Sequence, residues 1–411
     1  MAPGDAHAGD AVPAFPFRRR QPMRPCPTMT NMTACPILVV EDGPTNRTII
    51  TAHLRRAGFE DLIVAEDGQQ ALAALEERTP DLVLLDILMP VLDGFATCRA
   101  LRRDRRWSDL PVLAMTGLEQ ADERARIFAA GATDLILKPI NSAELIARIT
   151  SHLQNRMLIR SLRELNERTT AELAAARQMQ ETLLPGTALL AQIEGQYGVS
   201  LASRFAPSTE LAGDLWGAWP IDAERFGLFA LDVVGHGTIA AINAFRIHTL
   251  LWQGMTDHAD PGRFLESLNR KLRPLLAAGQ FATMFYAVLD VARDRIDYAA
   301  AGYTSPVIGN GAATRLLDGS GLPLGITQDA RYETRTASWM AGEALLLYSD
   351  ALSEAEAPGQ GGSLLGEEGA QCLCTEALRT GSAPLALERL AGAIRADAGL
   401  DDDLTLVCVM R

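Results

Sequence analysis

The first part of the sequence carries acidic residues, one threonine and one lysine, each at the end of a short aliphatic run. They are Glu41, Asp42, Asp86, Thr116 and Lys138. Crowded carboxylates bind Mg²⁺ through oxygen, and a hydroxyl and an ammonium group can hold phosphoryl oxygens. One carboxylate must stay free as the nucleophile, and Asp86 is placed for that. The pattern therefore predicts phosphoryl transfer to a carboxylate.

The C-terminal half carries a second set of aspartates, in four short segments. They are Asp214, Asp232, Asp350 and Asp402. A lone Asp-Gly or Ser-Asp pair is usually a turn, so each segment by itself favours a turn over a metal ligand. Taken together, the four acids suit two Mn²⁺ or Mg²⁺ ions. Two ions roughly 3.5–4 Å apart can share a water, lower its pKa and stabilise both oxygens of an in-line phosphoryl displacement.

A sheet must position the first set. Five aliphatic runs alternate with amphipathic helical stretches, at residues 37–40, 62–65, 82–85, 112–115 and 135–137. Runs of this kind are typical of strands that are buried on both faces, and the alternation predicts a five-stranded parallel α/β sheet. Chemistry in such sheets collects beyond the carboxyl ends of the strands, where the first set would meet.

A helical segment is expected between the two sets. Its apolar residues recur at three- and four-residue steps: Leu158, Leu162, Leu165, Leu173, Ala176 and Leu183. Thr169 interrupts this stripe, and Pro185 with Gly186 stops the helix. The segment predicts a coiled-coil linker that joins two copies of the chain. A surface helix packed on its own domain is the alternative.

Beyond Gly186, expected strands and helices come in groups, which favours an α+β domain with antiparallel sheets. The predicted organisation is a disordered tail over residues 1–35, a doubly wound α/β domain over 36–152, the linker over 153–185 and the α+β domain over 186–411. Either Met29 or Met32 could serve as the start.

Composition narrows the class of partner. The formal net charge of −13 argues against broad binding to nucleic acid or to an anionic membrane, and no apolar run is long enough to span a bilayer. The six cysteines are scattered, and Cys372-Leu373-Cys374 lacks the second pair of ligands that a zinc site needs. We expect buried thiols in a reducing cytoplasm.

The first set, with the run Asp86-Ile87-Leu88-Met89-Pro90, resembles the receiver domain of two-component response regulators. The resemblance implies a flavodoxin-like fold, a sensor histidine kinase as partner and Asp86 as the phosphoacceptor. It also implies an Mg²⁺ and phosphate pocket made of Glu41, Asp42, Asp86, the Leu88 carbonyl, Thr116 and Lys138. This family often has an aromatic switch residue three positions before the lysine, and Leu135 stands there. Phosphorylation could therefore be relayed by a different packing change.

The second set resembles PPM-type protein phosphatases of the SpoIIE/RsbU-like branch, within Ala212-Gly213-Asp214, Leu231 to Gly237, Tyr348 to Ala351 and Asp401 to Thr405. The resemblance implies a β-sandwich flanked by helices. It implies Asp214 and Asp232 as bridging, catalytic ligands, with Asp350 and Asp402 completing one ion and the Val233 carbonyl as a further ligand. His236 would either support its loop or bind metal.

Three positions depart from the phosphatase family: Ala212 and Ala351 replace glycines, and Gly217 stands where a second aspartate is frequent. The leading hypothesis is a response regulator whose phosphorylation at Asp86 controls a serine/threonine phosphatase. Its substrate would be a phosphorylated STAS-type anti-sigma-factor antagonist. The alternative is a pseudophosphatase that acts as a phosphorylation-controlled adaptor. A transcription factor is disfavoured because no helix-turn-helix signal is present.

Overall fold

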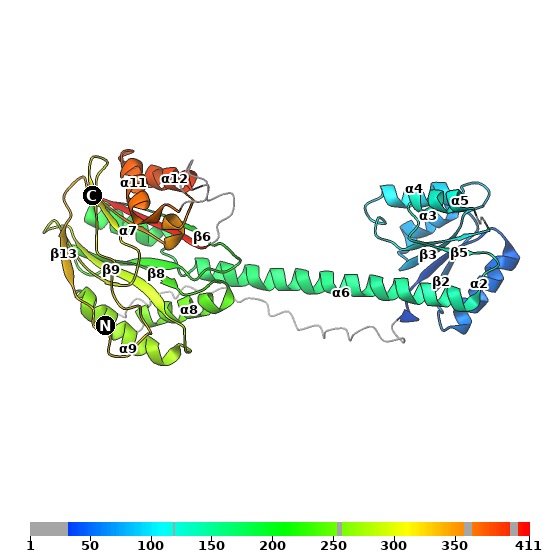
Figure 1. Ribbon diagram of the computed structural model, residues 1–411, viewed down its shortest axis with the longest axis horizontal. Coiled ribbons are helices and arrows are strands. Elements are labelled where there is room, and N and C mark those ends of the chain that lie inside the picture. Colours follow the sequence, from blue (N-terminus) through cyan, green and yellow to red (C-terminus); the bar gives the residue numbers. More distant parts are fainter. Residues whose placement is uncertain (1–31, 118–119, 253–256, 357–363, 395–401) are drawn as a thin grey trace, which may run out of the picture. The chain divides into compact units, whose positions relative to one another are not determined.

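The computed structural model describes residues 32–117, 120–252, 257–356, 364–394 and 402–411 (Figure 1). Most of the expected disordered tail, including Met29, lies outside these ranges. Met32 and Cys35, which were expected to belong to that tail, are buried against the first domain. The chain divides into two compact units between Glu167 and Arg168.

The first unit contains the predicted five-stranded parallel sheet, which is thereby confirmed, in the order β2-β1-β3-β4-β5. Its strands are β1 (Ile37–Val40), β2 (Leu62–Ala65), β3 (Leu82–Asp86), β4 (Val112–Thr116) and β5 (Asp134–Leu137). The residues of β1, β3 and β4 are buried throughout, as expected of strands covered on both faces.

Helices cover both faces of this sheet. They are α2 (Pro44–Arg56), α3 (Gly68–Glu77), α4 (Gly94–Arg103) and α5 (Ala121–Ala129). The start of α4 is set by Asp93, whose side chain accepts a 2.7 Å hydrogen bond from Ala96 N. A Cβ atom on Gly94 would lie 2.3 Å from the Asp86 carbonyl oxygen, so only glycine lets α4 begin this close to the end of β3.

Helix α6 (Ser142–Glu181) contains most of the expected linker. The helix begins before residue 153, because Leu145, Ile149 and Leu153 pack into the core of the first unit. Further along, the stripe residues Leu158 and Leu162 expose 53% and 56% of their surface. The linker is therefore helical, and its apolar stripe is exposed at these two positions.

The second unit is an antiparallel β-sandwich, which confirms the predicted fold class. One sheet has the order β13-β10-β9-β8-β7 and the other β12-β11-β14-β15-β6. The strands are β6 (Ser200–Ala206), β7 (Leu215–Pro220), β8 (Arg225–Val233), β9 (Ala282–Asp290), β10 (Arg295–Ala301), β11 (Val307–Gly309), β12 (Thr314–Leu316), β13 (Arg335–Ser338), β14 (Ala344–Tyr348) and β15 (Leu404–Met410).

Helices flank the sandwich on both sides (Figure 1). Helices α8 (Thr238–Trp252) and α9 (Pro261–Leu272) pack on the first sheet, and α11 (Gly366–Leu378) and α12 (Ala383–Ala393) pack on the second. Between the sheets lies a core that includes Trp216, Phe285 and Trp339. The short elements are α7 (Thr187–Tyr197), η1 (Arg273–Leu275) and α10 (Asp350–Ser353).

Several elements of the second unit were not anticipated, among them α7, β7 and the short strands β11, β12 and β13. The first strand was expected from Val199, and no helix was predicted between Gly186 and that strand. Helix α7 lies there and ends at Gly198, which is left-handed with φ 66°. Strand β7 was missed because it is short and contains Gly217 and Pro220, which are residues that strands usually lack. Among the described residues, no helix is long and apolar enough to cross a membrane.

Candidate functional site

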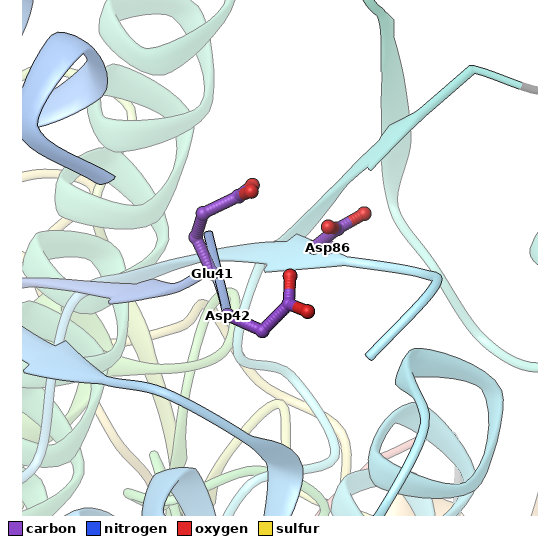
Figure 2. Close-up of side chains that lie close together, drawn as sticks. All are labelled: Glu41, Asp42 and Asp86. Carbon is purple, nitrogen blue, oxygen red and sulfur yellow. The ribbon is translucent and has the colours of Figure 1, made fainter. Parts of the chain in front are cut away.

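The first candidate site lies at the carboxyl ends of β1 and β3. Glu41, Asp42 and Asp86 each offer a carboxylate oxygen, and the three oxygens lie within 4.8 Å of one another (Figure 2). Glu41 and Asp86 are almost fully buried, whereas Asp42 is exposed. A group of buried and exposed oxygen donors at this spacing suits a hard divalent cation that keeps some of its water.

Lys138 bridges two of these acids. Its Nζ donates to Glu41 Oε2 at 2.9 Å and to Asp86 Oδ2 at 2.8 Å. Burial lowers the pKa of Lys138, but the hydrogen bonds to the two carboxylates outweigh it and raise that pKa overall. Burial raises the pKa of Asp86, and Lys138 opposes this effect. The ammonium group thus stands where a phosphoryl group on Asp86 would need a cation.

The remaining predicted residues of this pocket lie close by. Thr116, at the end of β4, is 1% exposed, and its carbonyl accepts from Lys138 N at 2.8 Å. Leu88 N lies 3.3 Å from Asp86 Oδ1, so the loop that carries the Leu88 carbonyl folds back over the aspartate. Leu135, where an aromatic residue was expected, is half-buried on β5.

The second candidate site is formed by the four aspartates of the sandwich unit, here called the acidic cluster. Asp214 precedes β7, Asp232 lies near the end of β8, Asp350 follows β14 by one residue and Asp402 precedes β15. Asp214 is 1% exposed. These strands belong to both sheets, so the sandwich gathers the four acids from distant parts of the chain.

The acids of the cluster raise one another's pKa. Burial raises the pKa of Asp232 to about 7, assisted by the charges of Asp350 and Asp402. Burial also raises the pKa of Asp350 to about 6, with Asp402 as the next cause. The pKa of Asp214 rises well above its usual range through burial and through Asp232. Such a cluster needs protons or cations to neutralise it.

Divalent cations fit the acidic cluster chemically. All side-chain donors are hard carboxylate oxygens. Asp214 Oδ2 is buried and has no hydrogen-bond partner among the described residues. The Val233 carbonyl lies beside the ligand loop, since a Cβ atom on Gly213 would come within 2.9 Å of it. Within the described ranges, however, only the receiver acids bring three carboxylates within 4.8 Å of one another.

Asp403 was not predicted, although it organises the loop that leads to Asp214. Its two carboxylate oxygens accept from Ser208 N at 2.8 Å and from Gly213 N at 2.7 Å. Its own carbonyl accepts from Ser349 Oγ at 2.8 Å, next to Asp350. Asp403 therefore connects three ligand-bearing segments. Only the repetition in Asp401-Asp402-Asp403 hinted at a second role there.

Gln180, near the end of α6, was also missed. Its Nε2 donates to the Ala212 carbonyl at 2.7 Å, and its Oε1 accepts from Ala212 N at 3.1 Å. Gln180 is 1% exposed and Ala212 is fully buried. The amide thus pairs with both backbone groups of Ala212, two residues before Asp214, and connects the linker helix to the ligand loop.

Two of the three departures from the phosphatase pattern, at Gly217 and Ala351, have local explanations. At Gly217 a Cβ atom would lie 2.4 Å from Phe229 Cε1, so the aromatic ring occupies the space of a larger residue. Ala351 lies in the first turn of α10 and is not among the residues with positive φ, so the backbone at this position does not require glycine. His236 is exposed.

Comparisons with known proteins agree with this division. The family described as "Response regulator receiver domain" matches residues 37–150, and "Stage II sporulation protein E (SpoIIE)" matches residues 222–411. The second match includes Asp232, Asp350 and Asp402 and begins after Asp214. Each of these two family matches covers one domain.

Relatives cover one domain each. Phosphoserine phosphatase RsbP of Bacillus subtilis is 31% identical over 191 residues, which are 45% of this chain and 46% of RsbP. The DNA-binding dual master transcriptional regulator RpaA of Synechocystis is 37% identical over 118 residues, 29% of this chain and 48% of RpaA. This chain thus spans about half the length of these relatives.

A solved structure supports the fold of the second unit. The SiaA-PP2C domain of Pseudomonas aeruginosa aligns with a TM-score of 0.52 at 20% identity, over 60% of this chain and 98% of that one. At this identity the likeness establishes the fold alone. Together with the family matches, it identifies the chain as a response regulator receiver domain joined to a PPM-type phosphatase domain of the SpoIIE family.

Proposed function

We propose that this protein is a response regulator in which phosphorylation of Asp86 controls a metal-dependent protein serine/threonine phosphatase. The observation that carries the proposal is the pairing of two different acid sites in one chain. One is the Lys138-bridged pocket around Asp86, and the other is the buried acidic cluster of the sandwich. The first suits phosphoryl uptake and the second suits phosphoester hydrolysis.

In the receiver, Asp86 is the nucleophile that takes a phosphoryl group from a sensor histidine kinase. Asp42, Asp86 and the Leu88 carbonyl would hold Mg²⁺ beside Glu41, and the ion would neutralise charge on the incoming group. Lys138 then exchanges its contact with the Asp86 carboxylate for one with a phosphoryl oxygen, and the Thr116 hydroxyl holds another.

In the phosphatase domain, Asp214, Asp232, Asp350, Asp402 and the Val233 carbonyl would hold two Mn²⁺ or Mg²⁺ ions. When bound, the ions supply an activated water and a counter-charge for the phosphoryl group. Asp214 and Asp232, the most deeply buried of the four, would hold both ions in place. Asp403 and Gln180 fix the loop that carries Asp214.

Similarity to the phosphoserine phosphatase RsbP supports the proposed substrate class. We assign to this chain a phosphoserine or phosphothreonine on a STAS-type anti-sigma-factor antagonist, in the cytoplasm. The five cysteines of the described ranges are free thiols, as a reducing compartment requires.

Release of inorganic phosphate from such a phosphoprotein, with Mn²⁺ present, tests the proposal. Wild type should release phosphate, Asp232→Asn should lose at least about a hundredfold in rate, and Asp329→Asn, at an exposed site, should match wild type. Equal rates for wild type and Asp232→Asn would show that the acidic cluster does not carry the reaction.

Control by the receiver would act through α6. The apolar stripe of Leu158, Leu162 and Leu165 is more than half exposed, and a second copy of the helix is the natural cover for it. The end of the same helix holds the Asp214 loop through Gln180. A change in the helix on dimerisation would therefore be transmitted to the loop that carries the metal ligand Asp214.

A second candidate function is a phosphorylation-controlled adaptor without hydrolysis. The wider spacing of the acids in the sandwich, compared with the receiver acids, favours it. Calorimetric titration with Mn²⁺ separates the two functions, because an adaptor has no need of micromolar metal affinity in this domain. The Asp86→Asn variant leaves only the phosphatase domain to bind the ion with such affinity.

A further inference from the structure

Tyr303 has a buried hydroxyl group that the proposed chemistry has not yet used. The side chain is 5% exposed, and its hydroxyl oxygen has no hydrogen-bond partner among the described residues. Leaving a buried polar group unpaired costs roughly 1–3 kcal/mol, and such groups are rare in native proteins. The Tyr303 hydroxyl can therefore form a hydrogen bond with a ligand that binds to the folded protein.

The strand register places Tyr303 beside the acidic cluster. Ala301 on β10 and Leu231 on β8 both pair with Met284 on β9, so the end of β10 lies level with the segment that carries Asp232. The chain then turns at Gly302, where φ is 72°. The Tyr303 ring enters the core between the two sheets.

Thr304, the residue after Tyr303, contacts the segment that carries Asp350. The hydroxyl of Thr304 donates to the carbonyl of Tyr348, two residues before Asp350. Tyr303 therefore lies between the segment that carries Asp232 and the segment that carries Asp350. Burial, followed by the charges of Asp214 and Asp232, raises the pKa of Tyr303 well above its usual range, so the hydroxyl keeps its proton and can donate.

Asp214 offers a matching acceptor. Its Oδ2 is buried without a partner, as the Tyr303 hydroxyl is. One region of the core thus holds a donor and an acceptor that have no hydrogen-bond partner among the described residues and do not bond to each other. Cations and their water would supply the oxygen atoms that join such groups into one network.

We propose that Tyr303 is a positioning residue of the metal site: its hydroxyl donates a hydrogen bond to the ligand oxygens of the acidic cluster when divalent cations are bound. Partners of this kind orient carboxylate ligands and strengthen metal binding, typically by ten- to a hundredfold. The inference rests on the metal binding of the proposed function and is independent of whether the bound site hydrolyses phosphoprotein.

Tyr303→Phe removes the hydroxyl and keeps the ring. Tyr332→Phe is the matched control, because Tyr332 also has a buried, unpaired hydroxyl but lies near Glu266 instead of the acidic cluster. Both changes are made in the full chain carrying Asp86→Asn, to weaken metal binding by the receiver. Mn²⁺ affinity is measured by calorimetry, and thermal unfolding is followed with and without Mn²⁺.

Tyr303→Phe should weaken Mn²⁺ binding by about tenfold or more while the metal-free protein unfolds at an unchanged or higher temperature. Tyr332→Phe should leave Mn²⁺ affinity unchanged. Two results would overturn the inference: equal Mn²⁺ affinity for Tyr303→Phe and wild type, or a clear loss of metal-free stability, which would mean that the hydroxyl is already bonded. No Mn²⁺ binding by the Asp86→Asn parent would instead reject the proposed metal site, and this inference with it.

Discussion

The double hydrogen bond between Gln180 and Ala212 makes a quantitative prediction. Gln180→Ala removes both bonds and leaves the backbone N–H and carbonyl of Ala212 without partners. Ala212 is 0% exposed. Each buried group without a partner costs roughly 1–3 kcal/mol of unfolding free energy, and partial entry of water reduces the total cost of the two groups. We therefore expect the phosphatase domain to lose about 2–4 kcal/mol of unfolding free energy. The loop that carries Asp214 should loosen as well.

Urea unfolding followed by tryptophan fluorescence measures this effect. Trp107 belongs to the first unit, and the second contains Trp216, Trp219, Trp252 and Trp339, so the signal reports mainly on the phosphatase domain. Gln196→Ala is the matched control, because Gln196 is exposed and makes one hydrogen bond, to the Asp222 carbonyl at 3.0 Å. The control should lose less than about 0.5 kcal/mol. Equal losses for the two variants would refute the reasoning.

Three further changes have expected outcomes. Lys138→Met removes the cation that bridges Glu41 and Asp86, and should slow phosphorylation by acetyl phosphate at least about tenfold, as read on phosphate-affinity gels. The metal-free phosphatase domain should lose stability as pH rises from about 4 to about 7. The folded-state pKa values of Asp232, about 7, and Asp350, about 6, lie above their unfolded values, so the stability present at low pH is lost as each carboxyl ionises. The slope is at most about 1.4 kcal/mol per pH unit for each group, and urea unfolding with chelator measures it. Leu162→Glu should convert dimers to monomers in analytical ultracentrifugation, because it places a charge in the exposed stripe.

Control variants and contradicting outcomes can be named for each of these predictions. Lys271→Met alters a lysine on α9 and should leave phosphorylation of Asp86 unchanged. Asn166→Glu adds the same charge as Leu162→Glu at an exposed position off the stripe, and should leave dimers intact. A pH slope that persists in Asp232→Asn at full size would assign the effect to other groups. A monomeric wild-type protein would show that the exposed stripe of α6 does not mediate dimerisation.

Sequence patterns predicted the receiver well because its chemistry is local to strand ends. Asp86 and Thr116 end strands of a parallel sheet and Lys138 directly follows another, and all such ends meet on one edge. The strand runs were aliphatic and uninterrupted, so the sheet could be predicted from periodicity alone. Nothing in that periodicity could tell that Met32 and Cys35 pack against the domain.

The phosphatase site was harder to predict because its supports are distant in sequence. Gly213 and Asp403 form a hydrogen bond across 190 residues. Local sequence cannot decide which neighbour in Asp401-Asp402-Asp403 faces that loop. No role was predicted for Gln180, because its burial depends on how the end of the helix meets Ala212. Helix α6 begins within the first domain and continues through the predicted linker, because its helical pattern is not interrupted at residue 153.

The most direct test of the central claim is phosphate release from a phosphorylated STAS-type substrate, with Mn²⁺, measured with and without beryllofluoride. Beryllofluoride mimics a phosphoryl group on the receiver aspartate. The account predicts a clear change in rate for wild type and none for Asp86→Asn, whose pocket lacks the acceptor carboxylate. Identical rates for wild type in both conditions, or a beryllofluoride effect that survives Asp86→Asn, would contradict control of the phosphatase by Asp86.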